Sequence, residues 1–222
     1  GFSVWDPARN YWKGEDKDRR SAYLFSPEEV WGGLPLDEPE KVCNGLISDW
    51  ASWQLEGGEA FAKLERVLSK LAPSSDEPLQ PGDLVKLSLR DARRHPTVRM
   101  PYGQQVPLVH ASAGIRRVVS LAYLLVWTWQ EHVASAELRG DEPAREIIFL
   151  IDEIEAHLHP QWQRRIVPAL LEVMEALTGE HDIPVQLVTA THSPLVLASV
   201  ESSFDPVRDA VWELDLREGE IV

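Results

Sequence analysis

The chain has 222 residues, with 36 acidic and 22 basic side chains and a net charge of −14 at pH 7. Its length is enough to bury a core and suits one or two domains. The acidic balance argues against bulk electrostatic binding to nucleic acid, which needs an excess of lysine and arginine on the bound face. The single cysteine, Cys43, excludes an internal disulfide, so we expect a cytoplasmic protein. No stretch of about 20 predominantly apolar residues is present, so we expect no membrane-spanning helix.

The N-terminal part of the chain predicts one strand followed by a helical region. Residues 1–6 indicate a strand that is ended by Asp-Pro. The sequence Ser-Pro-Glu-Glu at residues 26–29 is typical of a helix start, with a capping serine and a proline in the first turn. Apolar residues at helical spacing predict two further helices, over residues 39–55 and 59–71. Residues 73–82 are rich in proline and serine and are the best linker candidate.

Two features of the first hundred residues have two interpretations each. Trp31, Trp50 and Trp53 fit either a packed core or a platform on which a ligand stacks. We favour the core, because aromatic side chains at helical spacing usually pack inside a protein. The locally basic residues 90–95 fit either a solvated turn or a phosphate contact. We favour the turn, because a short charged run carries little information.

The middle of the chain predicts short strands followed by one long helix. Alternating apolar residues indicate strands over residues 84–89 and 97–100, and residues 102–105 are typical of a hairpin turn. Ser112 stands where a helix N-cap is expected. The helix that we expect over residues 114–136 is apolar almost all round its first turns, which predicts a deeply buried position.

A run of five apolar residues, 147–151, leads directly into Asp152 and Glu153. This run predicts a strand that is buried on both faces, with the acids at its carboxyl end. Open α/β sheets bind ligands at that end of their strands. One carboxylate there can hold the water shell of Mg²⁺, and its neighbour can orient or deprotonate an attacking water. A strand followed by an acidic loop without such a role is the alternative interpretation.

The C-terminal third predicts a helix after Pro160 with a kink at Pro168, and then a second buried strand over residues 185–190. Thr-His-Ser-Pro follows this strand, so His192 is expected at the same sheet edge as the acid pair. A histidine at such a place can bond a phosphate and an attacking water. Residues 211–220 indicate a closing hairpin.

Three of these motifs, in this order, resemble those of ABC-type ATPases of the AAA family, and especially the soluble proteins related to SMC, RecF and OLD. Residues 150–160 resemble the Walker B motif and D-loop, including a Glu-x-His-Leu-His-Pro run. Residues 112–117 resemble the signature motif, and residues 191–194 resemble the switch-histidine loop. The resemblance covers residues 106–222 and implies the C-terminal lobe of such an ATPase. The fold class would be α/β, with a mostly parallel sheet, flanking helices and a helical insert subdomain.

The resemblance also implies a role for each site residue. Asp152 would bind Mg²⁺ through water, and Glu153 would be the catalytic base or the group that positions water. His192 would contact the γ-phosphate of ATP and the attacking water. The residues that would contact the nucleotide of the opposite subunit are Ser112, Gly114 and Arg116. Glu155 and His159 would lie in the D-loop, which faces the other active site across a dimer.

The resemblance divides the chain into three parts and implies partners for it. Residues 1–20 would be a remnant of the N-terminal lobe, residues 21–82 a helical insert and linker, and residues 83–222 the ATPase lobe. The phosphate-cradling Gly-x-x-x-x-Gly-Lys-Ser/Thr loop is absent from the sequence. We therefore expect an upstream N-terminal lobe that carries this loop, a homodimer partner, and DNA or an effector nuclease as further candidates. The intact protein would hydrolyse ATP in DNA repair or anti-phage defence, and this chain alone would not.

Three other interpretations stay open. A non-catalytic dimerisation or regulatory module could keep the shape of the lobe, although it would not require Glu153 or His192. The nucleotide-binding domain of a transporter is the second, and the tryptophan-rich helical region disfavours it. Glu155, His157 and His159 could also form part of a zinc site, but no second cluster with the spacing of metal ligands is present.

Overall fold

The computed structural model of the chain describes residues 25–35, 41–144, 146–178, 184–214, 216–217 and 220–221. The helices are α1 (Pro27–Gly32), α2 (Leu46–Glu56), α3 (Glu59–Lys70), η2 (a 3₁₀ helix, Leu108–His110), α4 (Ala113–Arg139), α5 (Pro160–Gln163), α6 (Ile166–Thr178) and α7 (Pro194–Val200). The strands are β1 (Leu34–Pro35), β2 (Lys41–Cys43), β3 (Gln80–Pro81), β4 (Thr97–Arg99), β5 (Gln105–Pro107), β6 (Ile147–Ile151), β7 (Val185–Thr189), β8 (Leu216–Arg217) and β9 (Glu220–Ile221). The strand predicted at residues 1–6 and the lobe remnant predicted at residues 1–20 lie outside the described residues.

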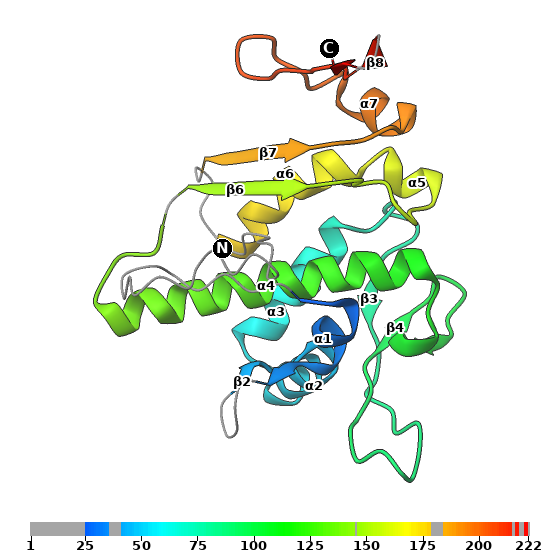
Figure 1. The fold of residues 1–222 in the computed structure, drawn as a ribbon. Coiled ribbons are helices and arrows are strands. Elements are labelled where there is room, and N and C mark those ends of the chain that lie inside the picture. Colours follow the sequence, from blue (N-terminus) through cyan, green and yellow to red (C-terminus); the bar gives the residue numbers. More distant parts are fainter. Residues whose placement is uncertain are drawn as a thin grey trace.

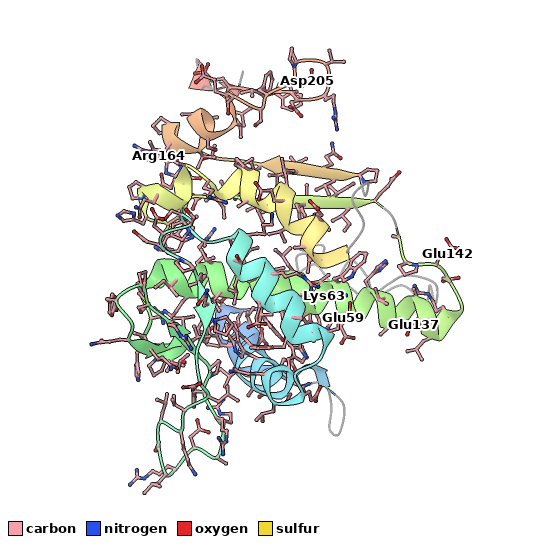
Figure 2. All side chains as sticks on the ribbon, turned by 180° about the vertical axis from the view of Figure 1, so that it is seen from behind. Glu59, Lys63, Glu137, Glu142, Arg164 and Asp205 are labelled. Atoms are coloured by element: carbon pink, nitrogen blue, oxygen red, sulfur yellow. The ribbon has the colours of Figure 1, made fainter. Side chains whose placement is uncertain are left out.

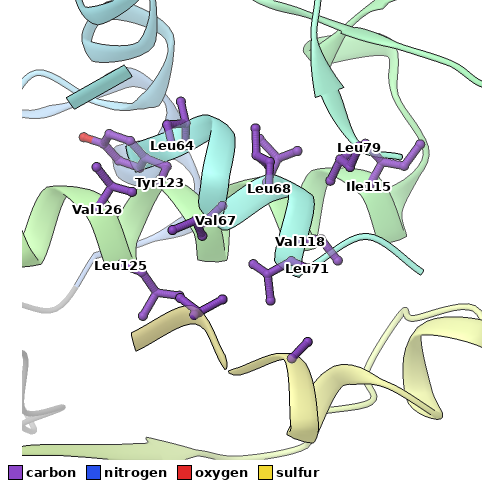
Figure 3. Packing of buried hydrophobic residues seen from close by; sticks show 14 of the residues in the cluster. Leu64, Val67, Leu68, Leu71, Leu79, Ile115, Val118, Tyr123, Leu125 and Val126 are labelled. Atoms are coloured by element: carbon purple, nitrogen blue, oxygen red, sulfur yellow. The ribbon is translucent and has the colours of Figure 1, made fainter. Parts of the chain in front are cut away.

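The long helix α4 crosses the middle of the molecule (Figure 1). Helices α1 and α2 lie on one side of it, and α6 with the strands β6 and β7 lies on the other. Helix α3 packs against both α4 and α6, so it joins the two sides. One core cluster therefore runs from Val30 in α1 to Val196 in α7. Figure 3 shows its centre, where Leu64, Leu68 and Tyr123 pack with almost no exposed surface.

A capping residue defines each end of helix α4. It begins after Ser112, whose hydroxyl accepts a hydrogen bond from the backbone N–H of Ile115 (3.3 Å). It ends at Gly140, which adopts a left-handed conformation with φ 71° that glycine tolerates without strain. Its inner face is buried along much of its length, for example at Val119 and Val126. The predicted burial of this helix is therefore confirmed.

The apolar spacing of residues 59–71 predicts helix α3 correctly. Leu64 and Leu68 are fully buried on one stripe of the helix. At its start, Lys63 Nζ lies 2.9 Å from Glu59 Oε1, an i,i+4 ion pair of the orientation that supports helices (Figure 2). The helix predicted over residues 59–71 is confirmed because pattern and packing agree.

The three tryptophans of the helical region belong to the core, as predicted. Trp50 is fully buried, and its indole N–H donates to the side-chain oxygen of Gln54 (3.1 Å). Trp31 and Trp53 are partly buried and pack against the same cluster. Helix α2 begins later than predicted, because Gly45 just before it adopts a positive φ of 85° that a right-handed helix does not allow.

The prediction of a mostly parallel sheet is corrected by the strand pairing. Within the described residues only β6 and β7 are parallel, with Ile147 opposite Val185 and Ile151 opposite Thr189. The other described strands form three small antiparallel sheets, β1–β2, β3–β4–β5 and β8–β9. These strands have two or three residues each, and β4 joins β5 through a short turn of the kind that connects antiparallel neighbours. The described residues therefore form a mixed α/β fold with one small parallel sheet.

The outer face of the parallel pair is exposed, contrary to the prediction of a strand buried on both faces. Side chains alternate along β6, so every second one packs on the core. Between them, Ile148 and Leu150 are 63% and 76% exposed. Val188 of β7 pairs with Leu150 and is 49% exposed. The described chain thus covers one face of this sheet and leaves an apolar strip on the other.

Two further predictions are wrong in detail. Residues 84–89 do not form a strand: Val85 makes a single bridge with His95, and Leu89 is 96% exposed. The predicted helix with a kink at Pro168 is instead two helices, α5 and α6. Pro168 lies in the first turn of α6, where the N–H that proline lacks would have no helical partner anyway.

The remaining elements agree with the sequence in part. The strand predicted over residues 97–100 is confirmed as β4, and the closing hairpin is present as the shorter pair β8–β9. In the linker candidate, residues 73–82, Leu79 is 5% exposed and belongs to the core cluster. The division of the chain into three parts stays a prediction. No helix in the described part of the chain is long and apolar enough to cross a membrane.

Candidate functional site

Two loops and the start of a helix, which lie far apart in the sequence, meet at the carboxyl end of β6 and β7 (Figure 1). The first follows β6 and spans residues 152–159, the second follows β7 and spans residues 190–193, and the third is the start of α4. The backbone N–H of Ala190 donates to the carbonyl of Ile151 (3.1 Å), which ties the first two loops together where the strands end. The sequence predicts this meeting of the acid pair, the switch-histidine loop and the signature helix.

Asp152 and Glu153 follow β6 in a bend, and both side chains are exposed. Glu153 adopts a positive φ of 47°, which residues other than glycine rarely do. Its carbonyl oxygen accepts hydrogen bonds from Arg117 Nη2 (2.9 Å) and from the backbone N–H of Ala156 (2.9 Å). This turn ends the alternation of the strand, so that two neighbouring carboxylates are both exposed at one edge. Such a pair can bind a hydrated cation and a water molecule.

Glu155 differs from this pair because its side chain is buried, with 5% exposed. Its Oε1 accepts a hydrogen bond from the backbone N–H of His192 (2.9 Å) and lies 3.0 Å from the ring Nδ1 of the same residue. Its Oε2 accepts a hydrogen bond from the hydroxyl of Thr191 (2.6 Å). Burial raises the pKa of the Glu155 carboxyl, but the bonds from Thr191 and the His192 N–H outweigh it and hold that pKa below its usual value. The group is therefore an ionised carboxylate that is occupied within its own chain.

The loop that carries His192 is fixed by hydrogen bonds on both sides. The hydroxyl oxygen of Thr191 accepts from the backbone N–H of Ser193 (3.1 Å), and Ser193 caps the start of α7. The hydroxyl of Ser193 donates to Gln163 Oε1 (2.7 Å), and Gln163 Nε2 donates to the carbonyl of Leu158 (2.9 Å). The His192 side chain itself is 81% exposed. A fixed backbone thus presents an accessible imidazole.

The start of α4 lies against the loop that follows β6. A side-chain carbon added at Gly114 would lie 3.0 Å from the carbonyl oxygen of His157, a closer approach than ordinary contacts. His157 itself adopts a positive φ of 62°. Ser112 and Arg116 flank this contact, and both are exposed. Glycine at position 114 therefore lets the first turn of α4, whose free N–H groups favour anions, approach the sheet edge.

An apolar cleft of about 650 Å³ opens beside this edge, between α1 and the first half of α4. Apolar side chains from α1, α4 and the loop after β6 line it, among them Trp31, Leu124 and Ile154. Arg116 and Arg117 also line it, so the cleft reaches the place where α4 meets the loop. Its size is that of a small-molecule pocket.

The three side chains of the zinc interpretation have separate contacts. Glu155 bonds Thr191 and His192, and His157 lines the apolar cleft. His159 Nδ1 accepts a hydrogen bond from a backbone N–H at the start of α5 (3.4 Å). Among the residues that the structure describes, no group of three or more histidine, cysteine, aspartate or glutamate side chains is placed to hold a metal ion.

Sequence reasoning missed Arg117 and Gln163, whose partners lie 36 and 30 residues away along the chain. One signal could have found Arg117, because it is three residues after Gly114 and so lies on the same helix face, toward the loop. For Gln163 the sequence offers no such signal. The carboxylate of Glu155 is bound within its own chain, so its predicted contact across a dimer stays a prediction without support from this geometry.

A comparison with protein families identifies the chain as an AAA domain. Residues 12–198 match the family described as "AAA domain, putative AbiEii toxin, Type IV TA system". This match covers most of the chain, and the chain therefore belongs to that family. The assignment confirms the resemblance to AAA-family ATPases that the motifs indicate.

Two curated relatives are similar over short regions. The "Retron Vc95 probable ATPase" of Vibrio cholerae serotype O1 biovar El Tor is 48% identical over 71 residues, which is 32% of this chain and 12% of that protein. The "Retron Ec83 probable ATPase" of Escherichia coli is 40% identical over 55 residues, which is 25% of this chain and 9% of that protein. The chain thus matches only a small part of the length of each relative.

Solved structures of SMC ATPases are similar at a low level. A chain from "Structural biochemistry of ATP-driven dimerization and DNA stimulated activation of SMC ATPases" is 15% identical, with a TM-score of 0.46 over 77% of this chain and 87% of that one. The "SMC head domain from Thermotoga maritima" is 16% identical, with a TM-score of 0.37 over 68% of this chain and 44% of that one.

Proposed function

We propose that the chain is the C-terminal part of an ATPase that binds and hydrolyses ATP between two protomers. The observation that carries this proposal is the meeting of three loops at one sheet edge, with Asp152 and Glu153 exposed among them. The membership in an AAA family and the similarity to two probable ATPases support the same activity.

Each side chain would have a role that suits its position. Asp152 would hold Mg²⁺ through water, and the ion would neutralise charge on phosphate oxygens. Glu153 would orient or deprotonate the attacking water, and His192 would contact that water and the γ-phosphate. The first turn of α4, with Ser112 and Gly114, would offer its N–H groups to the nucleotide of the opposite protomer. Arg116 would add positive charge beside that turn.

The activity would also need the upstream lobe that carries the Gly-Lys-Ser/Thr loop. The outer face of β6 and β7 supports this, because Ile148, Leu150 and Val188 leave an apolar strip exposed there. Parallel sheets are normally covered on both faces, and a two-stranded sheet is marginal by itself. A further lobe that packs on this face would bury the strip and place the phosphate-binding loop at the same edge.

We further propose a role in anti-phage defence rather than in DNA repair, because the two similar curated proteins are named as probable ATPases of retrons. The net charge of −14 disfavours DNA as the main partner. A protein effector, such as a nuclease, is therefore the better candidate for what ATP hydrolysis controls.

The test is ATP hydrolysis by the chain joined to its upstream lobe, wild type against Glu153→Gln. A positioned base contributes about 10²–10⁴-fold to rate, so hydrolysis is expected to fall by that factor. ATP binding and ATP-dependent dimerisation are expected to persist, because the substitution removes a charge and not a nucleotide contact. Glu137→Gln, an exposed position at the other end of α4 (Figure 2), is the matched control and should hydrolyse ATP normally.

Unchanged hydrolysis in Glu153→Gln would overturn the proposed catalytic role of Glu153. Absence of ATP hydrolysis by the wild-type chain joined to its upstream lobe would favour the non-catalytic dimerisation module. Mg²⁺-dependent turnover by the 222-residue chain alone, abolished by the same substitution, would show that the upstream lobe is not needed.

A further inference from the structure

The His192 side chain combines two properties that rarely occur together. It is 81% exposed, yet its ring Nδ1 lies at ion-pair distance from a buried carboxylate. Glu155 Oε1 lies 3.0 Å from ring Nδ1 and also accepts the backbone N–H of His192 at 2.9 Å. An exposed side chain normally samples several rotamers, so two contacts to one buried oxygen restrict both its rotation and its position.

The Glu155 carboxylate is itself held in place by its contacts. Its second oxygen, Oε2, is engaged by the hydroxyl of Thr191 at 2.6 Å, and the whole side chain is 5% exposed. An ionised carboxylate can only accept hydrogen bonds. At 3.0 Å an Nδ1 atom without a hydrogen would be repelled by the negative Glu155 oxygen, so this contact favours a hydrogen on Nδ1.

We propose that Glu155 is a positioning residue that fixes His192 in the Nδ1–H tautomer and leaves Nε2 as the atom that meets the substrate. This deepens the proposed function, on which the catalytic meaning of the tautomer rests. In the neutral ring Nε2 is then an acceptor that can orient the attacking water, and in the protonated ring it can donate to the γ-phosphate. In the opposite tautomer Nε2 would carry the hydrogen, and this acceptor would be lost.

A second set of hydrogen bonds joins the loops after β6 and β7 beside the Glu155–His192 pair. The Thr191–Ser193–Gln163 chain ends at the carbonyl of Leu158, in the same loop as Glu155. The loops after β6 and β7 are thus joined both through the carboxylate and beside it. These hydrogen bonds alone would hold the two loops together, whereas the ion-pair contact of Glu155 with the His192 ring acts on the side chain that is exposed.

The direct test is the tautomer of His192, read from two-bond ¹H–¹⁵N correlations of the imidazole at a pH where the ring is neutral. The 222-residue chain with ¹⁵N-labelled histidine is used, and the His192 signals are assigned by their loss in His192→Gln. The expected result is the Nδ1–H form in the wild-type chain. In Glu155→Gln, whose amide can donate to Nδ1, the ring is expected to shift toward the Nε2–H form.

An Nε2–H ring in the wild-type chain would overturn the proposal, and so would an unchanged Nδ1–H ring in a folded Glu155→Gln variant. If that variant does not fold, the wild-type tautomer alone decides. Glu201→Gln, an exposed glutamate at the end of α7, is the control and should leave the His192 signals unchanged.

The functional test uses the chain joined to its upstream lobe. Loss of a carboxylate that orients a histidine typically costs about 10–100-fold in activity, so Glu155→Gln should lower kcat by that factor with little change in KM. In a His192→Ala background Glu155→Gln should have no further effect, because a residue that acts through another is not additive with it. Additive losses would overturn the positioning role. If the wild-type chain joined to its upstream lobe does not hydrolyse ATP while the tautomer shifts as expected, the ATPase proposal fails and the Glu155–His192 geometry stands.

Discussion

Two buried carboxylates in this chain have the same kind of hydrogen-bond partners and opposite pKa shifts. Asp49, in α2, is 7% exposed and accepts from the hydroxyl of Tyr123 (2.8 Å) and from Asn44 Nδ2 (3.0 Å). Glu155 is 5% exposed and accepts from the hydroxyl of Thr191 and from a backbone N–H. Yet the pKa of the Asp49 carboxyl is raised above its usual value, and the pKa of the Glu155 carboxyl is lowered.

The difference comes from where each group lies. Asp49 sits between α2 and α4 inside the helical core, so burial is the largest influence on its pKa and the two side-chain bonds only reduce it. Glu155 lies at the sheet edge, where the bonds from Thr191 and the His192 N–H and the nearby imidazole together outweigh burial. The hydrogen bonds of Asp49 lie within the core and hold α2 in place. The contacts of Glu155 end at the exposed His192 ring and hold that ring at the sheet edge.

Replacement of Tyr123 by phenylalanine is expected to give the largest loss of stability at either network. It removes the hydroxyl and leaves one oxygen of the buried Asp49 without its donor, which costs about 1–3 kcal/mol. The ring still packs near Trp53 (centroids 5.8 Å apart), so little packing is lost. Urea unfolding at pH 7 measures the loss, and Tyr102→Phe, at a position that is 66% exposed, is the control.

The pH dependence of that loss has a defined sign. Because the folded-state pKa of Asp49 is raised, its stabilising contribution is greatest at low pH and falls as the pH rises through the folded pKa. Tyr123→Phe removes a donor to the ionised form and raises that pKa further. The loss should therefore be larger at pH 7 than at pH 4, and equal losses at the two values would contradict this account of Asp49.

Replacement of Thr191 by valine is expected to cost less, about 1 kcal/mol at pH 7, because it removes one bond at the edge of the molecule. The lowered pKa of Glu155 means that its stability contribution is present above the unfolded pKa and is lost as the pH falls through the folded pKa. The effect of the substitution should accordingly shrink as the pH falls from the usual glutamate pKa of about 4.3 toward the lower folded pKa of Glu155. Thr191→Ser keeps the hydroxyl and should behave like the wild type in the same unfolding series.

The contrast also shows what the sequence could predict. Apolar spacing predicts α3 and α4 because it is a local pattern, and the resemblance of the three motifs to those of ABC-type ATPases implies that their loops meet. The buried pairs Asp49–Tyr123 and Glu155–Thr191 join residues 74 and 36 positions apart, and a charged residue in the sequence does not reveal whether it will be buried. The exposed outer face of β6 could not be predicted either, because an apolar run indicates burial but not which part of a protein provides it.

Replacement of Arg117 by alanine is expected to have the smallest effect on global stability, below about 0.5 kcal/mol, because the bond from its guanidinium to the Glu153 carbonyl is at the surface. Its local effect should be larger. The same carbonyl accepts the N–H of Ala156, and both bonds hold the turn at the positive φ of Glu153. Hydrogen exchange at Ala156 is expected to rise about two- to fivefold, the factor that corresponds to one lost bond of 0.5–1 kcal/mol.

The amides of α3 are the internal reference in that measurement, because they open only when the core does, and Arg116→Ala is the neighbouring control. A rise confined to residues 152–158 would place the acid-pair loop at the low-stability end of the molecule, where parts that respond to ligands are expected. A uniform rise across α3 as well would mean that Arg117 supports the core. The distinction between an anchoring network around Asp49 and a presenting one around Glu155 would then no longer hold.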